Sequence, residues 1–175
     1  MFKVLVLICL GLFASASSLS VSSGSIQAHT EVFGDSNINP TTKEVKGELS
    51  IDDAITSLKG KIYFDTLSLI SNKKDRDSNM YELLNATKYK TVSFNINHVS
   101  QVEDKYLING TITLNGISNK VSTTAKIIEE NGILKLNGGF SILLTDYGME
   151  PPTMFFLTVR NLIDINYDIE LSKGN

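Results

Sequence analysis

The sequence predicts an all-β fold, either a β-sandwich or an up-and-down barrel, and three observations support this prediction. Apolar and polar residues alternate along about eight short segments, as expected for strands with one buried face. Turns rich in glycine, asparagine and proline separate these segments. Only one segment, near residues 78–86, has helical spacing, because Met80, Leu83 and Leu84 follow an i, i+3, i+4 pattern. We expect this helix to lie over one end of the β-structure as a lid or plug.

The first residues of the chain have the features of a secretory signal peptide. Lys3 supplies a positive charge, residues 4–13 form an apolar run, and Ala14-Ser15-Ala16 is a small-residue cleavage site. We therefore predict a signal peptide at residues 1–16 and a single domain at residues 17–175. The one cysteine, Cys9, lies within the predicted signal peptide, so the mature domain would have neither a disulfide nor a reactive thiol.

The composition excludes several classes of function. The formal net charge is −3, and charges of both signs are mixed along the chain without the basic stripe that nucleic-acid binding needs. No apolar run after the predicted signal peptide is long enough to span a bilayer, so we expect a soluble protein without stable membrane insertion. The absence of tryptophan argues against a module that stacks on carbohydrate.

The first part of the predicted domain contains three strands. Residues 17–25 are rich in serine, and we expect them to form a loose leader. Residues 34–40 contain the glycine, asparagine and proline of a turn. Alternation predicts half-buried strands at residues 26–32, 45–51 and 58–65.

A charged turn at residues 73–77 precedes the predicted helix, and a strand follows it. The cluster Asp75-Arg76-Asp77 has two interpretations: a solvated loop tip, or a polar rim in which a carboxylate holds Arg76. In the following strand, alternation places Val92, Phe94, Ile96 and His98 on one face.

The later strands carry stronger turn signals. Within the predicted strand 106–114, Gly110 indicates a bend or bulge. Asn115-Gly116 is a hairpin signal, but the next strand, predicted at 121–128, begins late enough that we expect a loop longer than two residues. Asn131-Gly132 predicts a tight hairpin. The remaining strands are expected at residues 133–136, 140–144 and 163–169.

The sequence contains no recognisable constellation for catalysis or metal binding. His29 and His98 are isolated from each other and from carboxylates at ligand spacing, which favours ordinary polar roles on strand faces. No serine lies in a nucleophile motif. We therefore predict a protein that is not an enzyme and has no metal or cofactor.

Several segments resemble the YceI-like, or polyisoprenoid-binding, family of secreted bacterial proteins. The most specific is residues 106–121 (YLINGTITLNGISNKV), which is similar to that family's G-x-L-T-i-x-G segment. Arg76-Asp77 with Met80 resembles its R-D-x-H-[LM] turn, with Asn79 in the histidine position. Further similar pieces, in the same order along residues 26–171, are residues 58–69, 89–94, 146–148 and 163–165.

The resemblance implies a lipocalin-like barrel of eight antiparallel strands around an elongated apolar tunnel. It further implies a periplasmic carrier of a long-chain isoprenoid or a similar amphiphile, whose chain lies inside and whose head is near a mouth. The implied partner is therefore the long-chain isoprenoid or another amphiphilic lipid, and a homodimer stays open. Residues Met149–Thr158 have no counterpart in the family pattern.

The direction of alternation predicts which residues would bind the ligand. This prediction assumes which strand face points inward, and an error of one residue would invert it. Arg76 and Asp77 are expected to pin a loop at the rim. The predicted ligand-binding residues are Ile62, Phe64, Met80, Leu83, Leu84, Phe94, Ile96, Ile112, Leu114, Phe140, Ile142 and Phe155.

Two other classes of function remain open from the sequence. The first is an interaction module, a barrel with a filled lumen that binds a protein through its outer surface or through Pro151-Pro152. The second is an enzyme acting on a lipid or quinone, for which the available polar groups are Arg76, Tyr106, Tyr147 and the two histidines.

Overall fold

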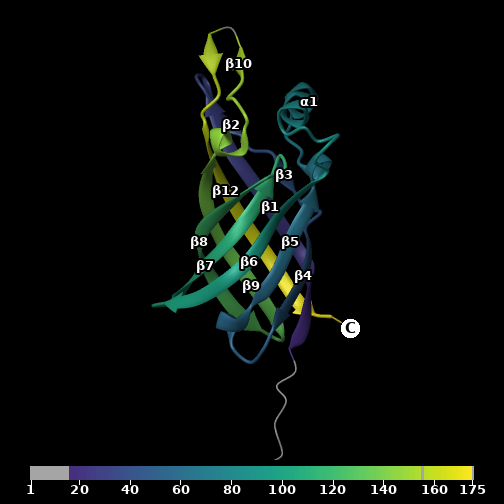
Figure 1. Ribbon diagram of the computed structural model, residues 1–175, viewed down its shortest axis with the longest axis vertical. Helices are drawn as coiled ribbons and strands as arrows, with labels where there is room; N and C mark the ends of the chain where they lie inside the picture. The colour runs from purple at the N-terminus through teal and green to yellow at the C-terminus, as the bar shows by residue number, and fades with distance from the viewer. Residues whose placement is uncertain (1–15, 155, 175) are drawn as a thin grey trace, which may run out of the picture.

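A computed structural model describes residues 16–154 and 156–174, and its main feature is a closed antiparallel barrel of eight strands (Figure 1). Neighbours along the sheet follow the order β12-β9-β8-β7-β6-β5-β4-β1, and pairing of β1 with β12 closes it. The prediction of an eight-stranded barrel is therefore confirmed. The barrel strands are β1 (Ser17–Val32), β4 (Lys46–Ile51), β5 (Lys59–Asp65), β6 (Thr91–Val102), β7 (Lys105–Leu114), β8 (Ile117–Glu130), β9 (Ile133–Leu143) and β12 (Leu162–Lys173).

Smaller elements join or flank the barrel strands. Two short strands, β2 (Asp35–Ile38) and β3 (Thr41–Thr42), pair with the second half of β1. The hairpin of β10 (Thr153–Met154) and β11 (Leu157–Thr158) stands above the same end of the barrel as the helix (Figure 1). The single-turn helices are η1 (Ile55–Ser57), η2 (Thr66–Ser68) and η3 (Leu144–Tyr147).

Strand β1 begins earlier than the sequence predicted. Residues 17–25 were expected to form a loose leader, but β1 starts at Ser17 and pairs with β4 and then with β12. Backbone pairing on both sides stabilises a strand whose own β-propensity is weak. The hydroxyl groups of Ser22 and Ser23 also donate hydrogen bonds to Glu170 on β12.

The one α-helix, α1 (Lys74–Leu83), also begins earlier than predicted. The charged residues 73–77, expected as a turn, form its first turn, where Asp75 and Asp77 lie near the positive end of the helix dipole. The helix ends at Leu83, and Asn85 follows in the left-handed conformation with φ 47°. The sequence thus predicted that a helix exists but placed it a turn too late.

Strand β6 changes register in its middle, and this corrects one prediction. Its pairing with β7 shifts between Ile96 and His98, which is the mark of a β-bulge. Beyond the bulge His98 is exposed, while Val99 points inward and is only 1% exposed. The prediction that His98 shares the face of Phe94 and Ile96 was therefore wrong.

Both Asn-Gly pairs form hairpin turns. Glu130 pairs directly with Ile133, which confirms the tight hairpin at Asn131-Gly132. Leu114 likewise pairs with Ile117, so the loop at Asn115-Gly116 has two residues and not more. The asparagine and glycine of each pair have positive φ angles, as a type I′ turn requires.

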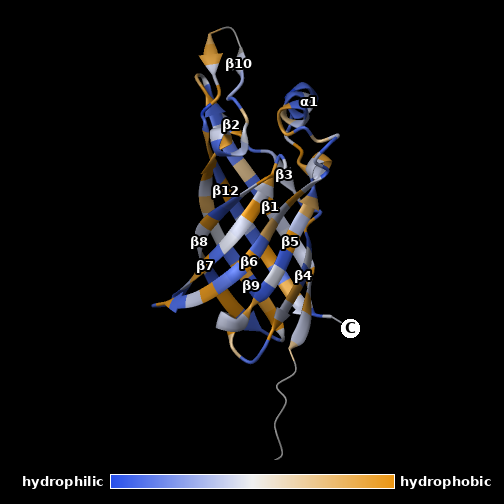
Figure 2. Cartoon of the chain, in the orientation of Figure 1, coloured by the Kyte–Doolittle hydropathy of each residue, from blue (hydrophilic) through white to orange (hydrophobic). Residues whose placement is uncertain are grey.

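The barrel interior divides into two regions along its axis. One end is filled by a cluster of buried aliphatic side chains, whose most enclosed members include Leu58, Ile108, Leu136 and Leu171. A second cluster, which includes Phe64, Ile112 and Ile163, surrounds open space at the end of the barrel that carries α1. Hydrophobic and hydrophilic residues alternate along the strands that enclose both regions (Figure 2). Within residues 16–154 and 156–174, no helix is long and apolar enough to cross a membrane.

Candidate functional site

The open region is an apolar cavity of about 590 Å³ at the end of the barrel that carries α1. Its wall comes from β1, β5, β6, β7, β8, β9 and β12, with α1 and residues 152–159 at its rim. Most wall residues are aliphatic or aromatic. A volume of this size lies within the usual range of small-molecule sites.

The structure places almost all of the predicted ligand-binding residues on this wall. Phe155 lies outside the described residues. A role in binding stays a prediction for all of them, and the structure shows that the other eleven line the cavity. The predicted residues that line the cavity are Ile62, Phe64, Met80, Leu83, Leu84, Phe94, Ile96, Ile112, Leu114, Phe140 and Ile142.

Two aromatic rings face each other inside the cavity. Phe94 and Phe140 are stacked with ring centroids 6.1 Å apart and an interplanar angle of 30°. Gly110 leaves room for Phe94, since a Cβ atom at this glycine would lie 2.2 Å from Phe94 Cζ. The sequence interpreted Gly110 as a bend or bulge. The glycine instead lets the Phe94 ring approach the backbone of β7 closely, and the bulge lies beside it in β6.

Sequence reasoning missed a pair of hydroxyl groups at the inner end of the cavity. Thr123 Oγ1 donates to the carbonyl oxygen of Gly139 at 2.9 Å and accepts from the Tyr167 hydroxyl at 3.0 Å. Burial raises the pKa of Tyr167, so this hydroxyl stays protonated at neutral pH. The alternation of Ile163, Ile165 and Tyr167 along β12 carried the signal that could have placed Tyr167 on the wall.

Polar groups at the mouth hold the loops around α1. Arg76 Nη2 donates to Asp35 Oδ2 at 2.7 Å, which ties α1 to β2. The hydrogen bond from the backbone N–H of Asn37 has the largest effect in lowering the pKa of Asp35, and the hydrogen bond from Arg76 has the next largest. Asp77 is buried, and its Oδ1 accepts the backbone N–H of Ser71 at 2.8 Å. Arg76 and Asp77 therefore pin loops and also line the cavity mouth.

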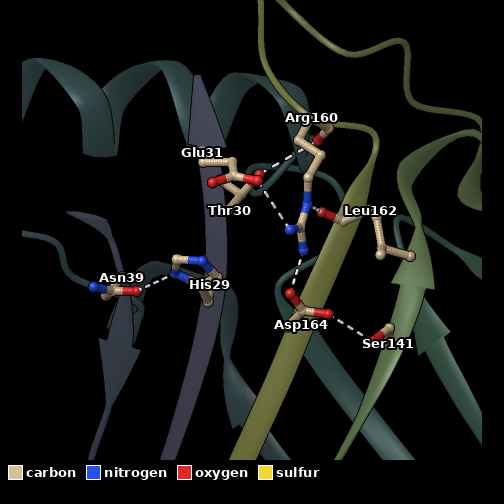
Figure 3. Close-up of polar contacts among 8 residues, drawn as sticks. All are labelled: His29, Thr30, Glu31, Asn39, Ser141, Arg160, Leu162 and Asp164. Carbon is tan, nitrogen blue, oxygen red and sulfur yellow. Dashed lines mark hydrogen bonds and ion pairs between the residues drawn. The ribbon is translucent and has the colours of Figure 1, made fainter. Parts of the chain in front are cut away.

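A second ionic cluster fastens residues 152–159 to β1 (Figure 3). The backbone N–H of Arg160 donates to the Glu31 carbonyl oxygen at 2.9 Å, and Arg160 Nη1 donates to Glu31 Oε1 at 3.1 Å. Arg160 Nη2 also pairs with Asp164, whose other oxygen accepts from Ser141 Oγ at 2.6 Å. The Ser141 hydrogen bond and then the Arg160 guanidinium lower the pKa of Asp164. Arg160 and Asp164 are four residues apart, but Glu31 and Ser141 are distant from both in sequence, so no local pattern could have predicted the whole cluster.

Most of the other polar groups considered from the sequence lie away from the cavity. His29 Nδ1 is 2.6 Å from Asn39 Oδ1 on the outside of the wall (Figure 3), and His98 is exposed. Tyr147 is fully buried behind the wall, and neither it nor Tyr106 lines the cavity. Among the described residues, no group of three or more histidine, cysteine or acidic side chains is arranged to hold a metal ion.

The closed barrel with its apolar cavity defines the class of small barrels that are wide enough to enclose one ligand. Within this class the chain belongs to the YceI-like family, because the model of the YceI-like domain matches residues 16–171. Protein YceI of Shigella flexneri is 31% identical over 91 residues, which cover 50% of this chain and 48% of that protein. A UPF0312 protein of Serratia proteamaculans is 29% identical over 106 residues, which cover 59% of this chain and 55% of that protein. The chain thus spans about half the length of these curated relatives.

Solved structures share the same fold at low sequence identity. BcnA of Burkholderia cenocepacia superposes with a TM-score of 0.71 at 13% identity, over 84% of this chain and 95% of that one. A polyisoprenoid-binding domain of Saccharophagus degradans superposes with a TM-score of 0.69 at 10% identity, over 90% of this chain and 99% of that one. The YceI protein of Campylobacter jejuni superposes with a TM-score of 0.68 at 18% identity, over 81% of this chain and 87% of that one.

Proposed function

We propose that this protein is a periplasmic carrier that holds one isoprenoid or similar long-chain amphiphile in the barrel cavity. The observation that carries the proposal is the apolar cavity itself, open at the end where Arg76 and Ser71 lie. The name of the Saccharophagus neighbour, a polyisoprenoid-binding domain, supports the same class of ligand.

The cavity wall offers affinity without specific polar contacts. Each buried CH₂ group contributes about 0.8 kcal/mol. A hydrocarbon chain would therefore gain most of its binding free energy from the aliphatic wall and from the stacked pair Phe94 and Phe140. Such contacts recognise apolar length and width more than chemical identity.

The polar head of the ligand is proposed to lie at the mouth beside α1. An arginine has five N–H donors, and Arg76 uses Nη2 for Asp35, so other donors remain for a hydroxyl or carbonyl oxygen. Asp75 and Asp77 are the other charged residues on the wall, which makes this mouth unfavourable for an anionic head.

The carrier role requires export, and residues 1–16 are proposed to provide it as a cleaved signal peptide. A long hydrocarbon does not stay dispersed in an aqueous compartment, so a protein interior is a suitable vehicle there. The role is proposed to be non-enzymatic, with no cofactor. Of the polar groups considered for catalysis, Arg76 lines the cavity, and it is already paired with Asp35.

One observation favours an interaction module as a second candidate function. Phe33 and Phe156 are 85% and 98% exposed, and both lie on turns at the mouth end of the barrel. Exposed aromatic side chains are typical of sites that contact another molecule. In that case the partner would be a protein, or a second copy of this chain.

Native mass spectrometry of protein purified from its own periplasm, followed by organic extraction, tests the carrier function. We expect an added mass that is extractable as an isoprenoid or another long-chain amphiphile. Phe94→Lys should abolish this mass, because it places a charge in the cavity. Asn95→Lys is the matched control, because the neighbouring Asn95 is exposed and the added charge stays in water. Retention of the ligand by Phe94→Lys, or an empty wild-type protein, would count against the carrier.

A further inference from the structure

The cavity ends part of the way along the barrel. At its inner end, next to the Thr123 and Tyr167 hydroxyl groups, several side chains of the wall also belong to the filled core, and these side chains form a floor. Beyond them the core continues with buried residues that do not border the cavity, such as Leu58, Leu134 and Leu171. The floor residues are Ile62, Ile96, Ile108, Leu136 and Ile169.

The floor has a consequence for the length of a ligand. The cavity has a finite volume of about 590 Å³, so it can bury only a limited stretch of a hydrocarbon chain. The interior of a folded protein is close-packed, so a longer chain cannot pass the floor without displacing Ile108 or Leu136. The remaining part of a longer chain would have to stay outside the mouth.

We propose that the floor sets the longest stretch of chain that the cavity can bury, and so the chain length at which the affinity for an amphiphile stops rising. The inference rests on the proposed carrier function and names the size class of its ligand. Each added CH₂ that enters the wall strengthens binding about fourfold. The gain stops when the chain reaches the floor, and further carbons add almost nothing.

A competition experiment measures this limit. The protein is mixed with isoprenoid alcohols of about 10 to about 45 carbons at equal concentrations, and native mass spectrometry identifies the bound species. We expect affinity to rise with chain length and then to reach a plateau within this series, and the shortest alcohol on the plateau has the preferred chain length. Longer species should show no further gain in affinity in pairwise competition.

Two leucines on β9 provide a matched pair of variants. Leu136 lines the floor, whereas Leu134 lies two residues away on the same face, inside the filled core. Leu136→Ala should extend the preferred chain by about three carbons, because it removes about three methylene-sized groups beside the cavity. Leu134→Ala creates a void of the same size below the floor and should leave the preferred length unchanged. This control separates cavity length from the poor solubility of long probes.

A third variant avoids weakening the core. Ala28 on β1 lines the cavity, so Ala28→Leu grows into open space and should shorten the preferred chain by about three carbons. A preference for the longest alcohols, or equal shifts in Leu134→Ala and Leu136→Ala, would overturn the length limit and leave the carrier function standing. Failure to bind an alcohol of any length would overturn the carrier function, and the limit with it.

Discussion

The two ends of the barrel use similar residues and differ in how they are packed. At the filled end, aliphatic side chains pack into one buried cluster, and Leu58, which follows η1, is part of it. At the hollow end, α1 stands at the mouth and contributes Met80 and Leu83 to the wall without filling the lumen (Figure 1). An alternating pattern of apolar residues therefore defines an interior, but it does not say whether that interior is solid. The packing of side chains at each end decides whether the interior is filled or hollow.

The largest difference should appear in the cost of removing a leucine from each end. Leu171 is 0% exposed in the filled core, whereas Leu114 is 7% exposed and borders the cavity. We expect Leu171→Ala to lower the free energy of unfolding by about 3–5 kcal/mol. Leu114→Ala should cost at least about 1 kcal/mol less, because a side chain beside open space has fewer contacts to lose. Urea unfolding of ligand-free protein compares them, and equal costs would remove the distinction between the ends.

The boundary between the two ends can be tested at Gly110. Gly110→Ala forces a Cβ atom against the ring of Phe94 and should cost about 1–3 kcal/mol of unfolding free energy. Phe94→Leu in the same chain should recover part of this loss, because the smaller side chain removes the collision with the ring but leaves the Asn95 carbonyl oxygen 2.6 Å from the added Cβ. A double-mutant cycle by thermal unfolding measures the coupling. Additive effects would show that Phe94 does not depend on the glycine.

The loop between η2 and α1 is predicted to depend on Asp77. Asp77→Ala leaves the Ser71 N–H without its acceptor and should cost about 1–2 kcal/mol. Asp77→Asn is the control, because its amide oxygen can still accept this hydrogen bond. Hydrogen exchange should become faster at residues 69–80 in the alanine variant alone and stay unchanged in the filled end. Faster exchange throughout the barrel would contradict a local role for this contact.

The smallest effect concerns the ionic cluster that fastens residues 152–159. The pKa of Asp164 is lowered from its ordinary value of 3.8, so the contribution of this carboxylate is present above that value and is lost as pH falls through the lowered pKa. Because the pair is partly exposed, Asp164→Asn should cost less than about 1 kcal/mol at neutral pH. The unfolding free energy of the variant should fall less than that of the wild type below about pH 4. Parallel acid profiles would exclude this role for Asp164.

The sequence predicted the barrel and the inward residues better than it predicted the limits of the cavity. Alternation along β5, β6, β7 and β9 identified wall residues such as Ile62 and Phe140, because the side-chain period of a strand is local. The β6 bulge at His98 and the pairing of the serine-rich start of β1 depend on neighbouring strands, so the local pattern misplaced them. Arg160 and Asp164 meet Glu31 and Ser141 through folding alone. No segment of the sequence carried that information.

The closing seam of the barrel also brings the two ends of the described domain together. The backbone N–H of Gly174 donates to the carbonyl oxygen of Ser18 at 3.0 Å, and the neighbouring Leu19 and Leu171 belong to the filled core, opposite the mouth. The chain end marked C in Figure 1 lies at this end of the barrel. A short linker between Gly174 and Ser18 would therefore suit a circular permutant, with new ends opened at a surface turn such as Asn131-Gly132. A molecule immobilised on a sensor surface through either end would present its cavity mouth to the solution.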